Sequence, residues 1–235
     1  MPTNHKTEQV ERLTRLLLLV TAAMLVLLLI LTVVFFATKP SSKPIKNPDG
    51  SPDTNSGDTV TPDAPADDGV TLPLTPDAGT AYQDKIIFVG DSLTAHLINR
   101  GVLTGGTATE QVWRCENNMM NLNSEVTAAK IIFPGTGEKM TVAEAAARAK
   151  PEIMIITLGT DWGVSYLSEA EFKDCYAGLI RAIQKASPKT KIILQSIFPV
   201  TAGCVNLDNG KIDTANKWVK AIAAENGCRY LDTQS

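Results

Sequence analysis

The chain has 235 residues with 22 basic and 25 acidic side chains, and its formal net charge of -3 leaves no basic footprint for nucleic acid. Nucleic acid is therefore not an expected partner. The cysteines show no Cys-x-x-Cys spacing, so we expect no zinc or other metal site. We expect four free and mostly buried thiols, at Cys115, Cys175, Cys204 and Cys228.

Residues 1–15 form a short tail before an apolar run from Leu16 to Ala37, in which Thr21 and Thr32 are the polar interruptions. As a helix rising about 1.5 Å per residue, this run reaches roughly 33 Å and can cross a bilayer core. A secretory signal usually has a shorter apolar core of about 7–15 residues and a small-residue exit. We therefore predict an uncleaved signal anchor in the cell membrane, with the globular part outside the cytoplasm; a cleaved signal is the alternative.

Residues 38–80 contain repeated prolines among Asp, Ser, Thr and Gly, and few large apolar side chains. Such a composition buries too little apolar surface to offset the entropy of ordering, so we predict a disordered linker. Residues 81–235 remain, which is the size of one ordinary globular domain.

The first predicted strand of this domain, Lys85 to Val89, runs through Gly90-Asp91-Ser92 into a short helix marked by Leu93 and Leu97. Its apolar, β-branched pattern is typical of a strand buried on both faces. A serine in such a turn lies at the carboxyl edge of a sheet and beside a helix N-terminus, where backbone N–H groups favour negative charge. Ser92 is thus placed either as a nucleophile or beside a bound anion.

Strands and helices then alternate along the chain. Two capping boxes predict helix starts at Thr141 and Ser168, and Asp213 or Thr214 is the expected cap of a last helix that ends at Gly227. The helix from Thr141 should end at Lys150, before a proline. Further strands are predicted at residues 111–115, 153–158, 191–197 and 228–232.

This alternation predicts right-handed βαβ units in a three-layer α/β/α fold with a five-stranded parallel sheet. A flavodoxin-like strand order 2-1-3-4-5 has its switch point between strands 1 and 3, and ligands bind outside the carboxyl ends there. The loops that leave these strands are Gly90-Asp91-Ser92 and Gly159-Thr160-Asp161. We therefore expect the two loops to meet at one cleft.

Gly90-Asp91-Ser92-Leu93 after an apolar strand resembles the first sequence block of the GDSL (SGNH) hydrolases, a family of serine esterases and acyl hydrolases. The resemblance implies Ser92 as nucleophile and as one oxyanion-hole N–H, with Gly106, or Gly105 beside it, as a second donor. Gly159-Thr160-Asp161 resembles the third block. The resemblance implies the α/β/α fold, the cleavage of acyl esters and no cofactor. Within the family, the chain looks most like extracytoplasmic bacterial members with an N-terminal anchor. An acylated small molecule or glycan is the implied substrate.

Two features depart from the family pattern. Asp161 stands where the family has an Asn donor, and an ionised carboxylate cannot donate; loss of one such donor typically costs about 2.7–4 kcal/mol in the transition state. Asp161 could donate if protonated, or it could match the last residue of the block, with the Asn absent. The family's Asp-x-x-His, which supplies the base, is also missing from the sequence. The two histidines are His5 and His96, and Asp232 near the end of the sequence has no histidine three residues after it. We expect a truncated chain; a pseudoenzyme is the alternative.

The second hypothesis is a catalytically inactive surface domain that binds glycan or a partner protein through the same cleft. Trp162, beside Asp161, is the aromatic residue expected to line that cleft, whereas Trp113 and Trp218 are expected in the core. A third hypothesis is an anion or phosphate site at Ser92, although no glycine-rich nucleotide fingerprint supports it. Together with Asp161, the cleft candidates are Asp91, Gly105, Thr160 and Trp162.

Overall fold

The computed structural model describes residues 68–234. The predicted tail, the anchor at residues 16–37 and most of the predicted linker lie outside the described residues. Within residues 68–234, no helix combines the length and apolar character needed to span a membrane.

The domain is built on a parallel sheet of five strands in the order β2-β1-β5-β6-β7. This order is the flavodoxin-like arrangement predicted from the sequence, with β1 and β5 adjacent at the switch point. Every residue of β5 is buried, as expected for the central strand of a parallel sheet covered on both faces. The strands span Ile86–Gly90 (β1), Val112–Trp113 (β2), Ile153–Thr157 (β5), Lys191–Gln195 (β6) and Arg229–Leu231 (β7).

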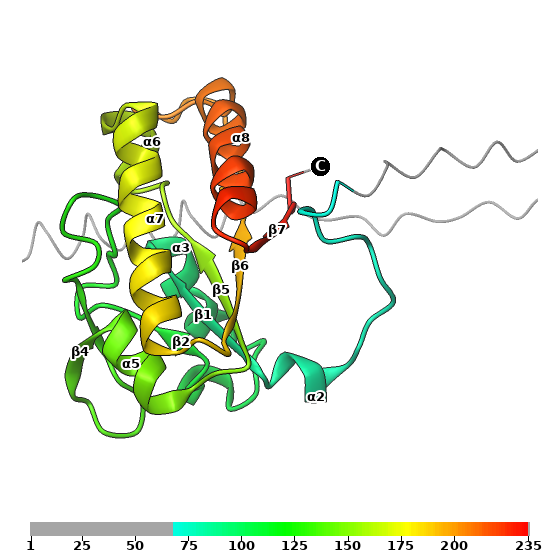
Figure 1. Cartoon of the computed structure of the whole chain (residues 1–235), viewed down its shortest axis with the longest axis vertical. Coiled ribbons are helices and arrows are strands. Elements are labelled where there is room, and N and C mark those ends of the chain that lie inside the picture. Colours follow the sequence, from blue (N-terminus) through cyan, green and yellow to red (C-terminus); the bar gives the residue numbers. More distant parts are fainter. Residues whose placement is uncertain (1–67, 235) are drawn as a thin grey trace, which may run out of the picture. The chain divides into compact units, whose positions relative to one another are not determined.

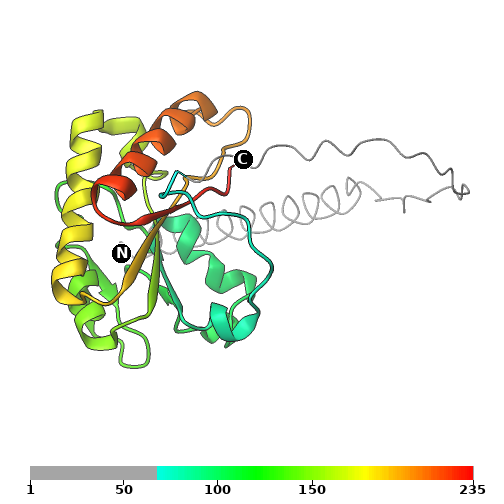
Figure 2. The same ribbon diagram turned by 45° about the vertical axis from the view of Figure 1, so that its right-hand side comes forward.

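Helices cover both faces of the sheet and complete the predicted three layers. Helices α5 (Val142–Ala149), α7 (Glu169–Ala186) and α8 (Asn209–Glu225) pack together over one face, and the short helices α3 (Ser92–Ala95) and α4 (Leu97–Arg100) lie on the other (Figure 1, Figure 2). Both predicted capping boxes are present, at the starts of α5 and α7. The core between α7, α8 and the sheet is apolar and includes Phe172, Tyr176, Leu179, Ile156 and Val219.

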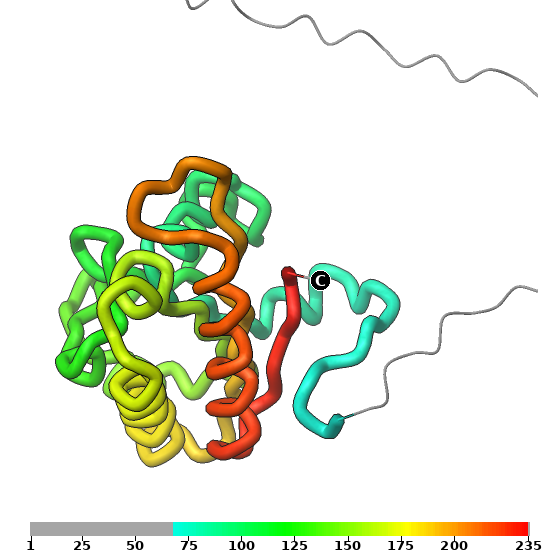
Figure 3. The backbone as a smooth tube through the Cα atoms, turned by 90° about the horizontal axis from the view of Figure 1, so that it is seen from above, coloured from blue at the N-terminus to red at the C-terminus, as the bar shows by residue number. Residues whose placement is uncertain are grey.

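The domain begins earlier than the boundary at residue 81 predicted from composition. Residues 68–72, which we call the edge segment, pair in parallel with β7 through Tyr230 N–H to Val70 O (2.9 Å) and Leu72 N–H to Tyr230 O (2.8 Å). The guanidinium of Arg229 donates to the carbonyls of Gly69 and Thr71. Figure 3 shows this cyan segment beside the red β7. The prediction of disorder is wrong here, because the backbone groups of an outer strand supply partners that composition does not reveal.

Helix α8 begins at Asn209, four residues or more before the predicted cap. Asp208 is the cap, since its carboxylate accepts the Lys211 N–H (3.0 Å). The polar first turn, with Gly210 in it, hides this start from a search for apolar periodicity. The structure also contains a hairpin of β3 (Lys130–Ile132) and β4 (Lys139–Thr141), and the short helices α2 (Thr80–Gln83), η1 (Gly106–Ala108) and α6 (Gly163–Tyr166), which the sequence analysis did not predict.

Candidate active site

Ser92 is the first residue of α3 and is separated from the end of β1 by Asp91 alone. The turn is possible because the residue before Asp91 is glycine. A Cβ on Gly90 would lie 2.2 Å from Thr94 Oγ1 and 2.3 Å from Thr157 O, which leaves no room for a side chain. The half-buried Ser92 therefore stands at the carboxyl edge of the sheet, where the sequence placed it.

Asp91 joins the two loops at the switch point. Its side chain is fully buried and accepts the Leu93 N–H at 3.2 Å and the Thr160 N–H at 3.1 Å. The first bond caps α3, and the second crosses from the β1 loop to the β5 loop. Asp91 and Thr160, both predicted cleft residues, are thus brought into contact through a structural hydrogen bond.

Asp161 connects the β5 loop back to Ser92 in the β1 loop. Its Oδ2 accepts the backbone N–H of Ser92 at 3.0 Å, and its Oδ1 accepts the Ser92 hydroxyl at 3.0 Å. Each loop therefore supplies one aspartate that accepts a backbone N–H of the other loop. In this structure Asp161 is an acceptor and not the oxyanion-hole donor of the family pattern.

Asp91 and Asp161 bring two carboxyl groups to one loop junction, and Asp91 is the fully buried one. Burial raises the pKa of Asp91 to about 6, and the negative charge of Asp161 acts in the same direction. The hydrogen bonds from Leu93 and Thr160 oppose this rise without cancelling it. Perturbed carboxyl groups of this kind are concentrated at functional sites.

Gly159 shapes the β5 loop that carries Asp161. Its φ of +128° lies in a region that side chains rarely adopt, and a Cβ there would lie 2.8 Å from Ile197 Cδ1. A glycine at this position lets the loop turn sharply after the buried β5 and present Thr160 and Asp161 toward Ser92.

Trp162 follows Asp161 and is 40% exposed. Its ring stacks on Tyr166 of α6, with the ring centroids 4.4 Å apart and the planes at 25°. Tyr166 is also exposed, so the two stacked rings together present an aromatic surface next to Asp161. Trp113 and Trp218 are packed in or against the core, as predicted.

Gly105 and Gly106 do not lie at this site. They precede β2, and Thr104 next to them donates to Asp84, which stands before β1 at the amino edge of the sheet. The Gly106 N–H donates to Leu103 O (2.9 Å). The prediction that one of these glycines supplies an oxyanion-hole donor is therefore wrong, because Ser92 lies at the opposite edge.

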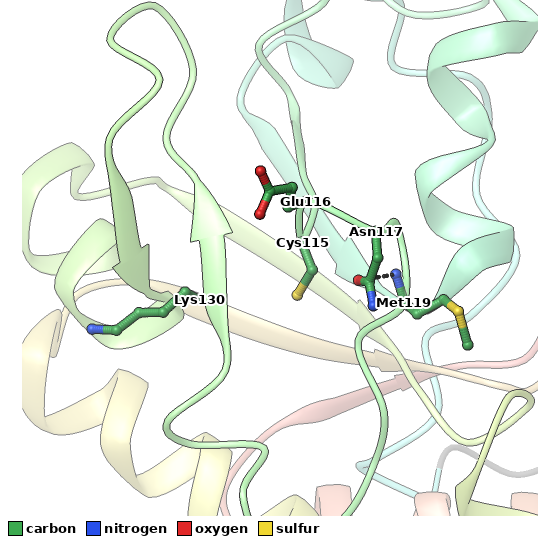
Figure 4. A pocket seen from close by; sticks show the side chains of 5 residues that line it. All are labelled: Cys115, Glu116, Asn117, Met119 and Lys130. Carbon is green, nitrogen blue, oxygen red and sulfur yellow. Dashed lines mark hydrogen bonds between the residues drawn. The ribbon is translucent and has the colours of Figure 1, made fainter.

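The loop that leaves the carboxyl end of β2 has no glycine. Asn118 adopts a positive φ of 58° there, a conformation that asparagine tolerates better than most residues, so the turn was not recognisable by searching for glycine. An open pocket of about 500 Å³ beside this loop is lined by Cys115, Glu116, Asn117, Met119 and Lys130 (Figure 4). Ser92 does not line it.

The histidines offer no base in the described part of the chain. His96 is exposed at the end of α3, and its N–H donates to the Ser92 carbonyl as part of the helix; His5 lies outside the described residues. The four cysteines are free in the structure: Cys115 and Cys228 are buried, Cys175 is half-buried and Cys204 is exposed. Within residues 68–234 no cluster of side chains could hold a metal ion.

The family model of the GDSL-like lipase/acylhydrolase family matches residues 88–235, well over half of the chain. The chain belongs to this family. The match begins in β1 and includes the Ser92 turn, so it confirms the resemblance noted on Gly90-Asp91-Ser92-Leu93. It also confirms that the chain belongs to a family of enzymes that act on acyl esters.

Solved structures with a similar fold include a family two carbohydrate esterase from Cellvibrio japonicus, at 16% identity and a TM-score of 0.41, over 64% of this chain and 51% of that one. Another is the periplasmic domain of a lipopolysaccharide acetyltransferase from Salmonella ser. Paratyphi A, at 15% identity and a TM-score of 0.42, over 64% and 66%. The GDSL-like chain thus spans about half of the first and two thirds of the second. No curated protein matches it. The family match alone supports the assignment.

Proposed function

We propose that this GDSL-like domain hydrolyses or transfers acyl esters through an acyl-enzyme on Ser92. The observation that supports this most is the position of the Ser92 hydroxyl, which stands at the carboxyl edge of β1 and is hydrogen-bonded to a carboxylate of the neighbouring β5 loop. Family membership supplies the reaction class. The position of Ser92 supports its hydroxyl oxygen as the atom that reacts.

In the proposed reaction, Ser92 Oγ attacks the carbonyl carbon of the ester and its proton passes to a base. The backbone N–H of Ser92 is the donor that we propose for the oxyanion that forms. Collapse of the tetrahedral intermediate expels the alcohol, which takes a proton, and leaves an acyl-enzyme. Water then gives hydrolysis, or a hydroxyl of an acceptor gives transfer. By resemblance, a late histidine acts as base in the family.

A fluorophosphonate probe tests the nucleophile, since it phosphonylates activated serines. We expect peptide mapping of the full chain to place the label on Ser92, and Ser92→Ala to remove it. Thr94→Ser provides a control for the label's position, because Thr94 is a buried hydroxyl on the same helix. A folded chain that is labelled elsewhere, or that is not labelled in any Asp161 form described below, contradicts the proposal.

The substrate we propose is an acylated glycan. Trp162 and Tyr166 offer exposed aromatic faces directly after Asp161, and aromatic rings pack well against the apolar faces of sugar rings. We expect Trp162→Ala to raise the KM for an acetylated oligosaccharide about tenfold and to leave the rate on p-nitrophenyl acetate unchanged. Tyr82→Ala, another exposed aromatic on α2, is the matched control. Equal effects on both substrates contradict a sugar contact.

The anchor predicted at residues 16–37 supports a location of the domain outside the cytoplasm, on the cell membrane, where envelope glycans are available. Retention at the membrane would place the enzyme close to such polymers. The support for this location comes from the apolar run at residues 16–37.

A second candidate is a binding domain without catalysis, and the contacts of Asp161 favour it. The carboxylate already takes both the hydroxyl and the N–H of Ser92. If the domain only binds, glycan affinity measured by calorimetry should survive Ser92→Ala and fall with Trp162→Ala, and ester hydrolysis should be absent in every variant.

A further inference from the structure

We propose that Asp161 occupies the position of the substrate's acyl oxygens, so that the described structure is a closed form of the active site. The carboxylate of Asp161 resembles the carboxylate that ester hydrolysis releases, and it contacts both groups of Ser92 that the reaction requires. The inference rests on the proposed function of Ser92.

The geometry leaves no free donor on Ser92. Oδ2 of Asp161 lies 3.0 Å from the Ser92 nitrogen, which is the distance expected for an oxyanion in the same place. Oδ1 lies 3.0 Å from Oγ and accepts the hydrogen bond of the hydroxyl. An ester oxygen can reach the N–H only after the carboxylate leaves.

The surrounding loops hold Asp161 in this position. Asp91 is fully buried and binds the Thr160 N–H, one residue before Asp161. Gly159 adopts the positive φ that turns the loop toward Ser92. These contacts hold the backbone of the β5 loop, so the closed form that we propose opens by movement of the Asp161 side chain.

The same contacts argue against Asp161 as the general base. A base must accept the hydroxyl proton while the oxyanion occupies the N–H, but here one carboxylate takes both. A carboxylate beside the oxyanion also repels the charge that develops there. As a base it would accelerate the reaction, and as an occupant it slows the reaction, so the two roles predict opposite effects of its removal.

The test compares rates of fluorophosphonate labelling at Ser92 in the wild type, Asp161→Asn and Asp161→Ala. We expect Asp161→Asn to react about 100-fold faster, because it removes the carboxylate and adds an amide donor. Asp161→Ala should fall between the two, because it only removes the carboxylate. Asp174→Asn, an exposed aspartate on α7, is the matched control and should react at the wild-type rate.

Added acetate gives a second measurement that a folding defect does not imitate. In Asp161→Ala, acetate can take the vacated place on Ser92, so we expect tens of millimolar acetate to slow labelling at least twofold, and neutral acetamide to have no such effect. The wild type should be insensitive to acetate, since its own carboxylate occupies the position.

Each outcome separates the two proposals. Faster labelling of both variants, with acetate slowing Asp161→Ala, supports the closed form. Labelling of Ser92 in the wild type at the same rate as in the variants, or faster, overturns the closed form and leaves the proposed function standing. Absence of labelling at Ser92 in every form overturns the proposed function itself.

Discussion

The two aspartates of the site differ in their environments although they lie in equivalent positions of adjacent loops. Asp91 is fully buried and accepts two backbone N–H groups, whereas Asp161 is half-buried and accepts from Ser92 alone. A buried carboxyl with a raised pKa holds its proton at mildly acidic pH. The pKa of Asp91, about 6, therefore makes the stability of this junction sensitive to pH.

Asp91→Asn measures that sensitivity. The ordinary pKa of Asp91, 3.8, applies to the unfolded chain, and the folded value is about 6. The folded chain thus binds an extra proton between about pH 4 and pH 6, and this stabilisation is complete below about pH 4 and is lost as the pH rises through about 6. We expect the free energy of unfolding of the wild type, relative to Asp91→Asn, to fall by roughly 2 kcal/mol between pH 4 and pH 7 in urea titrations.

Only the pH dependence of this difference is informative, because asparagine cannot accept both N–H groups and loses a bond at every pH. Asp161→Asn is the control variant. It removes the charge that is the second cause of the raised pKa of Asp91. In this background the pH range over which the stability falls should therefore move to lower pH, and stability should still fall as the pH rises. If the free energies of unfolding of the wild type and Asp91→Asn differ by the same amount from pH 4 to pH 7, the raised pKa of Asp91 is contradicted.

Among the elements, the edge segment at residues 68–72 has the least support from sequence pattern and the clearest structural role. It covers the outer edge of β7 with two backbone hydrogen bonds, and Asp68 forms an ion pair with Lys220 of α8 (2.6 Å). The Lys220 ammonium and the N–H groups of Val70 and Thr71 hold the pKa of Asp68 far below its usual range. An exposed strand edge invites pairing with other chains, and this segment prevents it.

Leu72→Pro tests the edge segment. Proline removes the N–H that donates to Tyr230 O, and since Tyr230 is only 4% exposed, its carbonyl is left without that partner. We expect the midpoint of urea unfolding to fall by an amount equivalent to about 1–3 kcal/mol. Leu74→Pro, two residues on, where the side chain is fully exposed, is the matched control and should change stability little. Equal midpoints for the two variants contradict a structural role of the pairing.

The sequence predicted the elements whose signals are local. The five strands of the sheet, their order and both capping boxes could be predicted from apolar runs and from the spacing of Thr141 to Glu144 and Ser168 to Glu171. The edge segment could not, because its partners lie about 160 positions away in the chain. The start of α8 was missed for the opposite reason, since Asp208 is a local cap followed by a turn with low helix propensity.

At the scale of the whole molecule, the sequence could predict where the site lies more readily than what its residues do there. The strand order brought Ser92 and Asp161 together, and the structure places them 3.0 Å apart. The predicted donor role of Gly106 is wrong because this glycine precedes β2, whereas the site lies at the carboxyl ends of the strands. Hydrogen-bond direction at Asp161 depends on side-chain geometry that no sequence pattern encodes.

Location completes the proposed function, and the chain carries its own reporter for it. Cys204 is exposed, whereas Cys115 and Cys228 are buried, with pKa values raised by burial, and react slowly as thiols. If residues 16–37 anchor the chain with the domain outside, a membrane-impermeant maleimide should label Cys204 on intact spheroplasts. Lysis should not increase the labelling, and Cys204→Ser should remove most of it.

Deletion of residues 16–37 should release the chain from the membrane fraction. Labelling of Cys204 that requires lysis would place the domain inside, away from envelope glycans, and would remove the support for a glycan substrate that location provides.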